Sequence, residues 1–188
     1  MTDRKPDALT PSSRPGALTT APTGDLVSRG LADLQRLDVV FPDKHLEAVV
    51  REALEKPDGP LTRGDLESLE ELEAPKSGIK DLTGLGHCVN LTELWLTSNE
   101  ISDITPLASL TNLTNLWLKN NQISDLTPLA SLTNLTELWL YRNSFSDITP
   151  LTALTSQTRL TLWGNPLSQE SIEVHLRTLE LRGLIVML

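Results

Sequence analysis

The feature that most constrains this chain is a stretch of sequence repeated four times at a fixed period. Three full copies read LTELWLTSNEISDITPLASLTN, LTNLWLKNNQISDLTPLASLTN and LTELWLYRNSFSDITPLTALTS, and a shorter copy, TRLTLWGNPL, follows them. One asparagine recurs every 22 residues, at Asn99, Asn121, Asn143 and Asn165. A fixed period of roughly 20–50 residues is typical of solenoids, in which each unit buries its apolar face against the next. The flanking segments are therefore predicted to be caps or tails of a solenoid.

Each full repeat opens with two leucines that alternate with polar or aromatic residues. Such alternation predicts a short strand with one buried face, parallel to its copies in the neighbouring repeats. These leucines are Leu94 and Leu96, Leu116 and Leu118, and Leu138 and Leu140. The asparagine three residues later marks the turn out of the strand, where its amide can donate and accept hydrogen bonds for backbone groups. Leucines and an asparagine in this pattern are typical of leucine-rich repeats.

Apolar residues then recur at a spacing of three, in the first full repeat at Ile101, Ile104, Leu107 and Leu110. This spacing predicts tight helical turns that face the core. Each turn begins with a Thr-Pro pair such as Thr105-Pro106, which we interpret as a hydroxyl cap followed by a proline at the first helical position. The sequence thus predicts an α/β solenoid: a leucine-rich-repeat arc with a concave parallel β-sheet, short 3-10 or helical turns on the convex side, and helical caps.

Four segments follow from this pattern. Residues 1–24 are rich in Pro, Ser and Thr and lack periodic apolar residues, which predicts a disordered tail. Residues 25–65 are predicted to form a helical N-terminal cap, and residues 66–167 about five repeats, of which three are full. Residues 168–188 are predicted to form a C-terminal cap helix and strand. Caps are needed because the first and last repeats have no outer neighbour to cover their apolar edges.

Within the caps, polar residues are predicted to begin the helices. Asp43 precedes an apolar stripe at Leu46, Val49, Val50 and Leu54. Thr62 is followed three residues later by Asp65, a capping-box pattern. Ser168 precedes a helix whose buried face is predicted from its spacing to be Ile172, His175, Leu176 and Leu179.

The repeat LTxLxLxxNxISDIxPLxxLTN and the cap sequences FPDKHLEAVVREAL and NPLSQESIEVHLRTLELRG resemble the internalin-type leucine-rich-repeat family of bacteria. The resemblance covers about residues 40–186. It implies the fold described above and a role in binding other proteins through surface residues that vary freely. Secreted internalins carry signal peptides and often wall anchors, and this sequence shows neither.

Charge and hydropathy narrow the expected partners and compartment. The net charge is −9, from 25 acidic and 16 basic residues, which argues against a nucleic-acid backbone or an anionic membrane as the partner. The first residues contain no apolar run of signal-peptide length, and no apolar stretch is long enough to insert into a membrane. The default expectation is a monomeric, cytoplasmic protein. Export by a non-cleaved N-terminal signal is the alternative.

The sequence contains no evident catalytic or metal-binding pattern. Its three histidines lie far apart, and none has the spacing of metal ligands. The single cysteine, Cys88, takes the position that Leu110 holds in the next repeat, which predicts a buried core residue. Four aspartates one repeat apart suggest either an ion site or turn chemistry, and we interpret them as turn residues: Asp81, Asp103, Asp125 and Asp147. We predict no enzyme activity, no cofactor and no metal site.

All four tryptophans are predicted to lie on the solvent side of the strands. Trp95, Trp117 and Trp139 hold the same position in successive repeats, and Trp163 is shifted by two places. Strands stack about 4.8 Å apart, so three tryptophans would form a ridge about 10 Å long on the concave face. Apolar patches rimmed by polar groups mark binding surfaces. The alternative is that adjacent rings only cover one another and stiffen the sheet.

The sequence therefore predicts a non-catalytic module that binds a polypeptide partner on its concave face. The predicted apolar anchors are Trp95, Trp117 and Trp139. The residues predicted to orient the partner are Tyr141, Trp163, Lys119, Glu93, Glu137 and Arg159. Two other functions remain open. One is a glycan-binding surface, since flat aromatic ladders also stack on sugar rings, and the other is a ligand-free scaffold segment of a larger signalling or effector protein.

Overall fold

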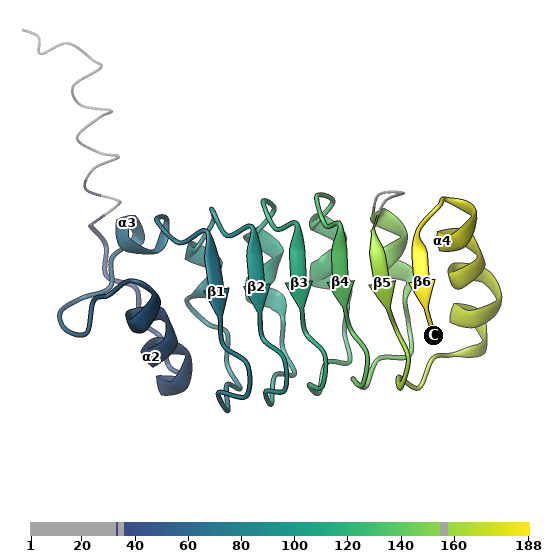
Figure 1. Cartoon of the computed structure of the whole chain (residues 1–188), viewed down its shortest axis with the longest axis horizontal. Helices are drawn as coiled ribbons and strands as arrows, with labels where there is room; N and C mark the ends of the chain where they lie inside the picture. The colour runs from purple at the N-terminus through teal and green to yellow at the C-terminus, as the bar shows by residue number, and fades with distance from the viewer. Residues whose placement is uncertain (1–32, 34–35, 155–157) are drawn as a thin grey trace, which may run out of the picture.

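The computed structural model describes residues 33, 36–154 and 158–188. The predicted tail and the start of the predicted N-terminal cap lie outside these residues. In the described part, one parallel sheet contains six strands in chain order: β1 Glu71–Glu73, β2 Glu93–Trp95, β3 Asn115–Trp117, β4 Glu137–Trp139, β5 Arg159–Thr161 and β6 Ile185–Met187. Figure 1 shows the sheet as one layer with the short helical turns behind it.

The strands are paired so that equivalent positions of successive repeats lie side by side. The central position of every strand faces the core, and it is held by Leu72, Leu94, Leu116, Leu138, Leu160 and Val186. The five leucines are almost completely buried. The predicted leucine-rich-repeat solenoid is thus confirmed, with its core between the sheet and the convex turns.

The convex layer consists of 3-10 turns, at Leu85–His87 (η1), Thr105–Ser109 (η2), Thr127–Ser131 (η3) and Thr149–Ala153 (η4). The predicted threonine caps are wrong. Thr105 is itself the first residue of η2, and the residue before it, Ile104, makes no side-chain capping hydrogen bond. Asp103 holds the start of this turn instead: its Oδ1 accepts from the Thr105 N–H at 2.8 Å. Hydrogen bonds from the Thr105 side chain and backbone lower the pKa of Asp103. The same bond recurs in the other repeats, so the interpretation of these aspartates as turn residues is confirmed.

The repeated asparagines satisfy backbone groups inside the turns, as predicted. Asn121 is 9% exposed, and its Nδ2 donates to the carbonyl oxygens of Leu96 and Leu118 at 2.9 and 3.0 Å. Its Oδ1 accepts from the Ile101 N–H at 3.1 Å. Asn143 makes the equivalent bonds one repeat later. Each asparagine therefore joins its own repeat to the preceding one.

The N-terminal cap is anchored to the first repeat by Asp43. This residue begins helix α2, Lys44–Ala53, whose Leu46 and Val50 are buried. One oxygen of the Asp43 carboxylate accepts from the Leu46 N–H, while the other accepts from the backbone N–H groups of Lys80 and Asp81 at 2.7 and 3.1 Å. Partial burial alone would raise the pKa of Asp43, but these backbone donors lower it below its ordinary value.

The capping box predicted for Thr62 and Asp65 is present at the start of helix α3, Arg63–Leu66. Asp65 Oδ2 accepts from the Thr62 N–H, the Thr62 hydroxyl and Lys56 Nζ, each at 2.7 Å. Burial on its own raises the pKa of this carboxyl, but the bonds from Lys56 and Thr62 outweigh it and bring the pKa to about 2, from an ordinary 3.8. A single carboxylate thus links α3 to the loop after α2.

Acid is expected to loosen this cap. Because the folded pKa of Asp65 lies below its unfolded value, the stabilisation is fully present above about pH 4 and is lost as the pH falls through about 2. The side chain is 27% exposed, so we expect Asp65→Asn to lower the free energy of unfolding at pH 6 by about 1–2 kcal/mol. Urea unfolding should show this difference shrinking towards zero at pH 2. An equal difference at both pH values would contradict the assignment.

The C-terminal cap begins where predicted, because Ser168 Oγ accepts from the Ser171 N–H at 3.1 Å. The helix then widens into a π-helical segment, η5 Ser171–Leu176, before α4, Arg177–Leu181. A π-helical turn closes i→i+5 hydrogen bonds, so the face that it buries is rotated relative to that of an α-helix. Ile172, predicted to face the core, is 50% exposed, and that part of the prediction is wrong.

Ser171 takes the buried position in place of Ile172. Its hydroxyl donates to the Ser146 carbonyl at 2.8 Å and accepts from the Ile148 N–H at 3.2 Å. Leu176 and Leu179 complete the buried face. This bonding fixes the rotation of the cap helix against the last full repeat.

Candidate binding surface

The side chains between the leucines form columns on the concave face, because the strands pair in register. The first column is Glu71, Glu93, Asn115, Glu137, Arg159 and Ile185, and the second is Glu73, Trp95, Trp117, Trp139, Thr161 and Met187. A third column, two residues further along each repeat, is Thr97, Lys119, Tyr141 and Trp163. Backbone hydrogen bonds between successive repeats hold the third column in line.

The tryptophans of the second column pack on one another. Trp95 and Trp117 are stacked, with centroids 4.5 Å apart and planes 4° apart. Trp139 meets Trp117 edge-on, at 6.2 Å and 75°. Trp117 is therefore only 9% exposed, whereas Trp95 and Trp139 are half-buried. The expected ridge of three exposed rings is reduced to two accessible rings that flank a nearly buried one.

Aromatic and cationic side chains gather around the third column. Tyr141 and Trp163 are stacked, with centroids 4.4 Å apart and planes 11° apart. Lys119 Nζ lies 4.9 Å from the Trp139 centroid and 5.5 Å from that of Tyr141. Arg142 Cζ lies 4.8 Å from the Trp163 centroid. We call these five residues the aromatic–cation cluster, and Trp163 is its most accessible ring at 39% exposure.

Arg142 was not predicted as a site residue. It directly follows the third column, at a position that also has a left-handed backbone in neighbouring repeats: φ is 57° at Ser98, 55° at Asn120 and 55° at Arg142. Sequence alone offers a weak signal here, because the position varies in residue type. The left-handed turn places the Arg142 side chain against the ring of the next repeat.

Thr161 interrupts the second column where a tryptophan would continue it. It is 6% exposed, and within the described residues its Oγ1 is a buried side-chain oxygen without a hydrogen-bond partner. An unpaired buried hydroxyl costs about 1–3 kcal/mol. Its neighbours in the register are Trp139 and Met187. The unsatisfied hydroxyl therefore lies beside the aromatic–cation cluster.

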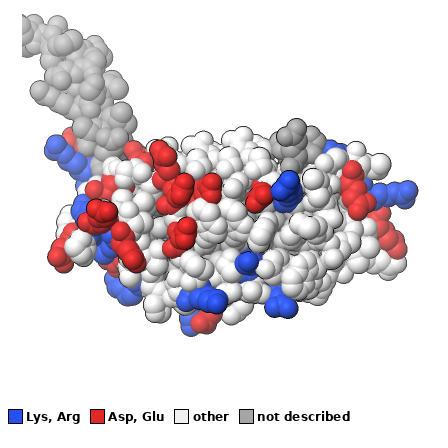
Figure 2. All heavy atoms as spheres, viewed as in Figure 1, with Lys and Arg blue, Asp and Glu red and all other residues white. Residues whose placement is uncertain are grey.

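The charges of the concave face are separated along the solenoid. Glu71, Glu73 and Glu93 lie on β1 and β2, whereas Lys119 and Arg142 belong to the aromatic–cation cluster. Glu137 on β4 and Arg159 on β5 form an ion pair, with 3.5 Å between Glu137 Oε1 and Arg159 Nη1. Figure 2 shows acidic residues gathered over β1 and β2, and a broad uncharged area over the middle strands. Of the predicted residues, Glu93 thus lies at the acidic end, and Lys119, Trp139, Tyr141 and Trp163 belong to the aromatic–cation cluster.

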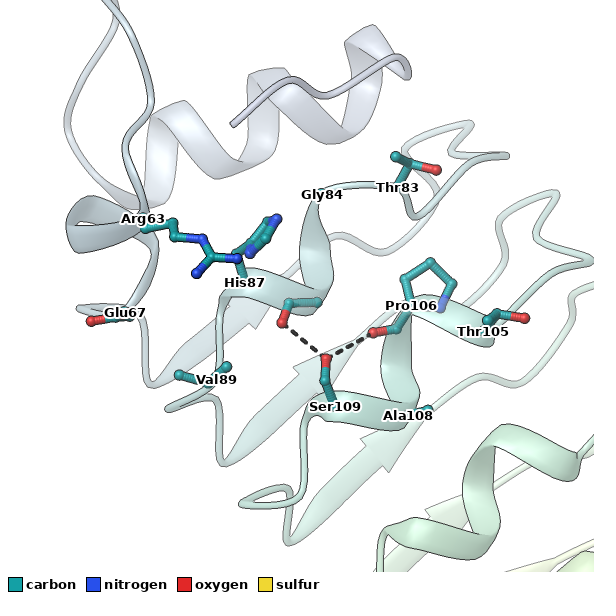
Figure 3. Close-up of a pocket in the computed structure, with 11 residues that line it drawn as sticks. Arg63, Glu67, Thr83, Gly84, His87, Val89, Thr105, Pro106, Ala108 and Ser109 are labelled. Atoms are coloured by element: carbon teal, nitrogen blue, oxygen red, sulfur yellow. Dashed lines mark hydrogen bonds between the residues drawn. The ribbon is translucent and has the colours of Figure 1, made fainter. Parts of the chain in front are cut away.

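A hollow of about 530 Å³ lies on the convex side, between α3 and the turns η1 and η2. Figure 3 shows Arg63 and His87 directed towards one another across it, and burial followed by the Arg63 charge lowers the pKa of His87. Ser109 Oγ donates to the Gly86 carbonyl at 2.9 Å. The repeat pattern does not predict this hollow. Its only signal is a pair of glycines, Gly84 and Gly86, where the next repeat has proline and alanine.

The single cysteine has a structural role in the core. Cys88 is fully buried, as predicted, and burial raises the pKa of its thiol to about 12, so the thiol stays protonated. Among the described residues, no group of three His, Cys, Asp or Glu side chains lies together as metal ligands do. In the same part of the chain, no helix has the length and apolar character needed to cross a membrane.

Comparison with known proteins identifies the same repeat. The family model for leucine-rich repeats (two copies) matches residues 67–109 and 111–153. No curated protein sequence matches the chain. Among solved structures, an internalin (inlF) from Listeria monocytogenes is 26% identical with a TM-score of 0.64, over 80% of this chain and 58% of that one. This chain therefore spans less than two thirds of the length of that relative.

Two further structures share the fold. A leucine-rich-repeat protein of Leptospira interrogans is 25% identical with a TM-score of 0.63, over 81% of this chain and 41% of that one. The functional domain of InlJ from Listeria monocytogenes is 24% identical with a TM-score of 0.54, over 69% of this chain and 38% of that one. The repeats and the sheet they build show a leucine-rich-repeat solenoid, and the chain is similar to the internalins and related leucine-rich-repeat proteins of bacteria.

Proposed function

We propose that this chain is a non-catalytic protein-binding module whose concave face holds a segment of a polypeptide partner. The observation that carries the proposal is the aromatic–cation cluster, in which the exposed Trp163 stacks on the half-buried Tyr141, and Lys119 lies over Tyr141 and the half-buried Trp139. Aromatic and arginine side chains of this kind dominate binding energy at protein interfaces. The rings are already immobilised by stacking, so a partner that covers them costs little additional side-chain entropy.

The arrangement of the rings favours a polypeptide over a glycan. Stacking on a sugar requires a free aromatic face, but Trp95 and Trp117 turn their faces to each other. Tyr141 and Trp163 do the same, and Lys119 and Arg142 lie over ring faces in the cluster. Trp163 is still 39% exposed, Arg142 is exposed and Lys119 is half-buried, so part of that ring and the cationic donors remain accessible. These groups suit the apolar side chains, carboxylates and carbonyl oxygens of a polypeptide.

Removing two rings of the cluster should abolish partner capture. We expect Trp139→Ala/Trp163→Ala to weaken binding of any protein captured by the immobilised wild-type chain at least 30-fold, since interface tryptophans each contribute about 2 kcal/mol or more. Capture would be made from the native cell and its neighbours, and affinities measured by surface plasmon resonance. Val89→Ala, at a 38% exposed apolar residue of the convex hollow, is the matched control.

Three outcomes separate the candidate functions. Loss of a protein partner with the double variant, but not with Val89→Ala, supports the proposal. A partner that binds the double variant as tightly as the wild type would refute it. A tryptophan fluorescence titration with an oligosaccharide panel is expected to show no response, and a saturable response lost in the double variant would favour the glycan alternative.

A further inference from the structure

The acidic end of the concave face holds three carboxylates that are not ion-paired. Glu71 and Glu73 are exposed and Glu93 is half-buried. Within the described residues, no lysine or arginine forms an ion pair with any of these three carboxylates. They lie on adjacent strands, so they form one negative area at the start of the sheet. Neighbouring like charges repel one another, and a basic group from outside would relieve that repulsion.

The two cations at the other end also lack acidic partners. Five other basic residues of the described chain are paired with carboxylates, namely Lys44, Arg51, Lys56, Lys80 and Arg159, whereas the exposed Lys76 of the first repeat is not. Lys119 and Arg142 instead lie over aromatic rings. A cation held over a ring keeps its charge and its hydrogen-bond donors, because the ring cannot replace a carboxylate as acceptor. The cluster therefore presents two positioned donors to the solvent.

We infer that the polypeptide held on the concave face carries separated charges: basic residues over β1 and β2, apolar side chains over the tryptophans, and acidic residues at Lys119 and Arg142. This inference rests on the protein-binding function proposed above. A partner placed the other way round would bring like charges together at both ends. The charges thus set both the class of partner and its orientation.

The spacing of the sheet sets the separation of those charges. Along the solenoid, the carboxylates of β1 and β2 lie one to three strands from Lys119 and Arg142, which is about 5–14 Å. An extended partner covers this distance with about two to four residues, and a helical one with about three to nine.

Reversing the charge of one end at a time tests the inference. A displayed library of random dodecapeptides would be selected on the immobilised wild-type chain and on two variants. Glu71→Lys/Glu93→Lys leaves two lysines against Glu73, so both ends then carry net positive charge, and it should enrich peptides with acidic residues only. Lys119→Glu/Arg142→Glu makes both ends acidic, and it should enrich peptides with basic residues only. The wild type should enrich peptides that carry both charges at the separations given above.

Affinities of individual peptides complete the test. We expect each reversal to weaken a peptide selected on the wild type at least tenfold. Glu170→Lys/Glu180→Lys, on the exposed C-terminal cap helix, changes the net charge by the same amount as Glu71→Lys/Glu93→Lys and should leave the affinity within twofold. Circular dichroism and urea unfolding of every variant would verify its fold.

The outcomes distinguish this inference from the function beneath it. Peptides that require Trp139 and Trp163 but carry no separated charges, or that tolerate both reversals, would overturn the inference and leave the proposed function standing. If no selected peptide depends on Trp139 and Trp163, the proposed function fails, and the inference fails with it.

Discussion

Replacing Asn121 by alanine is expected to lower the free energy of unfolding by about 3–4 kcal/mol, although no apolar contact of the core is removed. The Ile101 N–H, on a residue with no exposed surface, would lose the acceptor it has in the Asn121 side chain. An unpaired buried N–H costs about 1–3 kcal/mol. The carbonyl oxygens of Leu96 and Leu118 would each lose one of two amide donors, because Asn99 and Asn143 also bond to them.

Urea unfolding, followed by circular dichroism, would measure this change. Asn112→Ala is the matched control, because Asn112 is an exposed asparagine of the same repeat family whose Nδ2 donates to the Val89 carbonyl at 3.0 Å. Its bond is exposed to water, so we expect a loss below about 1 kcal/mol. Equal losses in the two variants would mean that burial of the asparagine ladder contributes nothing to stability.

Replacing Gly84 by alanine should be nearly as damaging, at about 3–4 kcal/mol, for a different reason. Gly84 has φ 99° and ψ −30°, a conformation that side chains disfavour. A Cβ at this position would also lie 2.9 Å from two ring carbons of Phe41. Phe41 is 2% exposed and belongs to the core, so its ring cannot move without disturbing the packing. The variant should therefore separate the N-terminal cap from the first repeat.

A second glycine isolates the packing part of this cost. Gly59 has φ 81°, but a Cβ there would meet no atom within 4 Å. Gly59→Ala should thus cost only the backbone strain, about 1 kcal/mol. The difference between the two variants, from urea unfolding, measures the contact with Phe41. Phe41→Leu in the Gly84→Ala background should recover part of the loss, and strictly additive effects would argue against a direct contact.

The aromatic residues show what a sequence pattern can predict and what it cannot. The placement of Trp95, Trp117 and Trp139 on one face follows from alternation alone, and the register of the sheet confirms it. Their accessibility does not follow. Ring stacking depends on side-chain torsions and on the distance between strands, so Trp117 becomes nearly buried between its neighbours. The pattern identifies the face, whereas the packing decides which rings a partner can touch.

The C-terminal cap shows the same limit for a helix. Helical spacing placed Ile172 in the core, because it assumed 3.6 residues per turn throughout. The hydroxyl of Ser171 instead pairs with the backbone of the preceding repeat, and the helix widens to allow it. That competition between side-chain burial and a backbone hydrogen bond takes place between segments more than 20 residues apart. It has no local signature.

By itself, the sequence determined the solenoid, its strands, its convex turns and its asparagine ladder, because each depends on a residue's place within one repeated unit. Only the tertiary structure decided how the side chains of the proposed binding surface are arranged. The stacking of Tyr141 on Trp163, the position of Lys119 and the unpaired hydroxyl of Thr161 all arise between repeats. The repeated sequence specifies the same backbone conformation every 22 residues. Contacts between repeats depend instead on which side chains lie next to each other on strands about 4.8 Å apart.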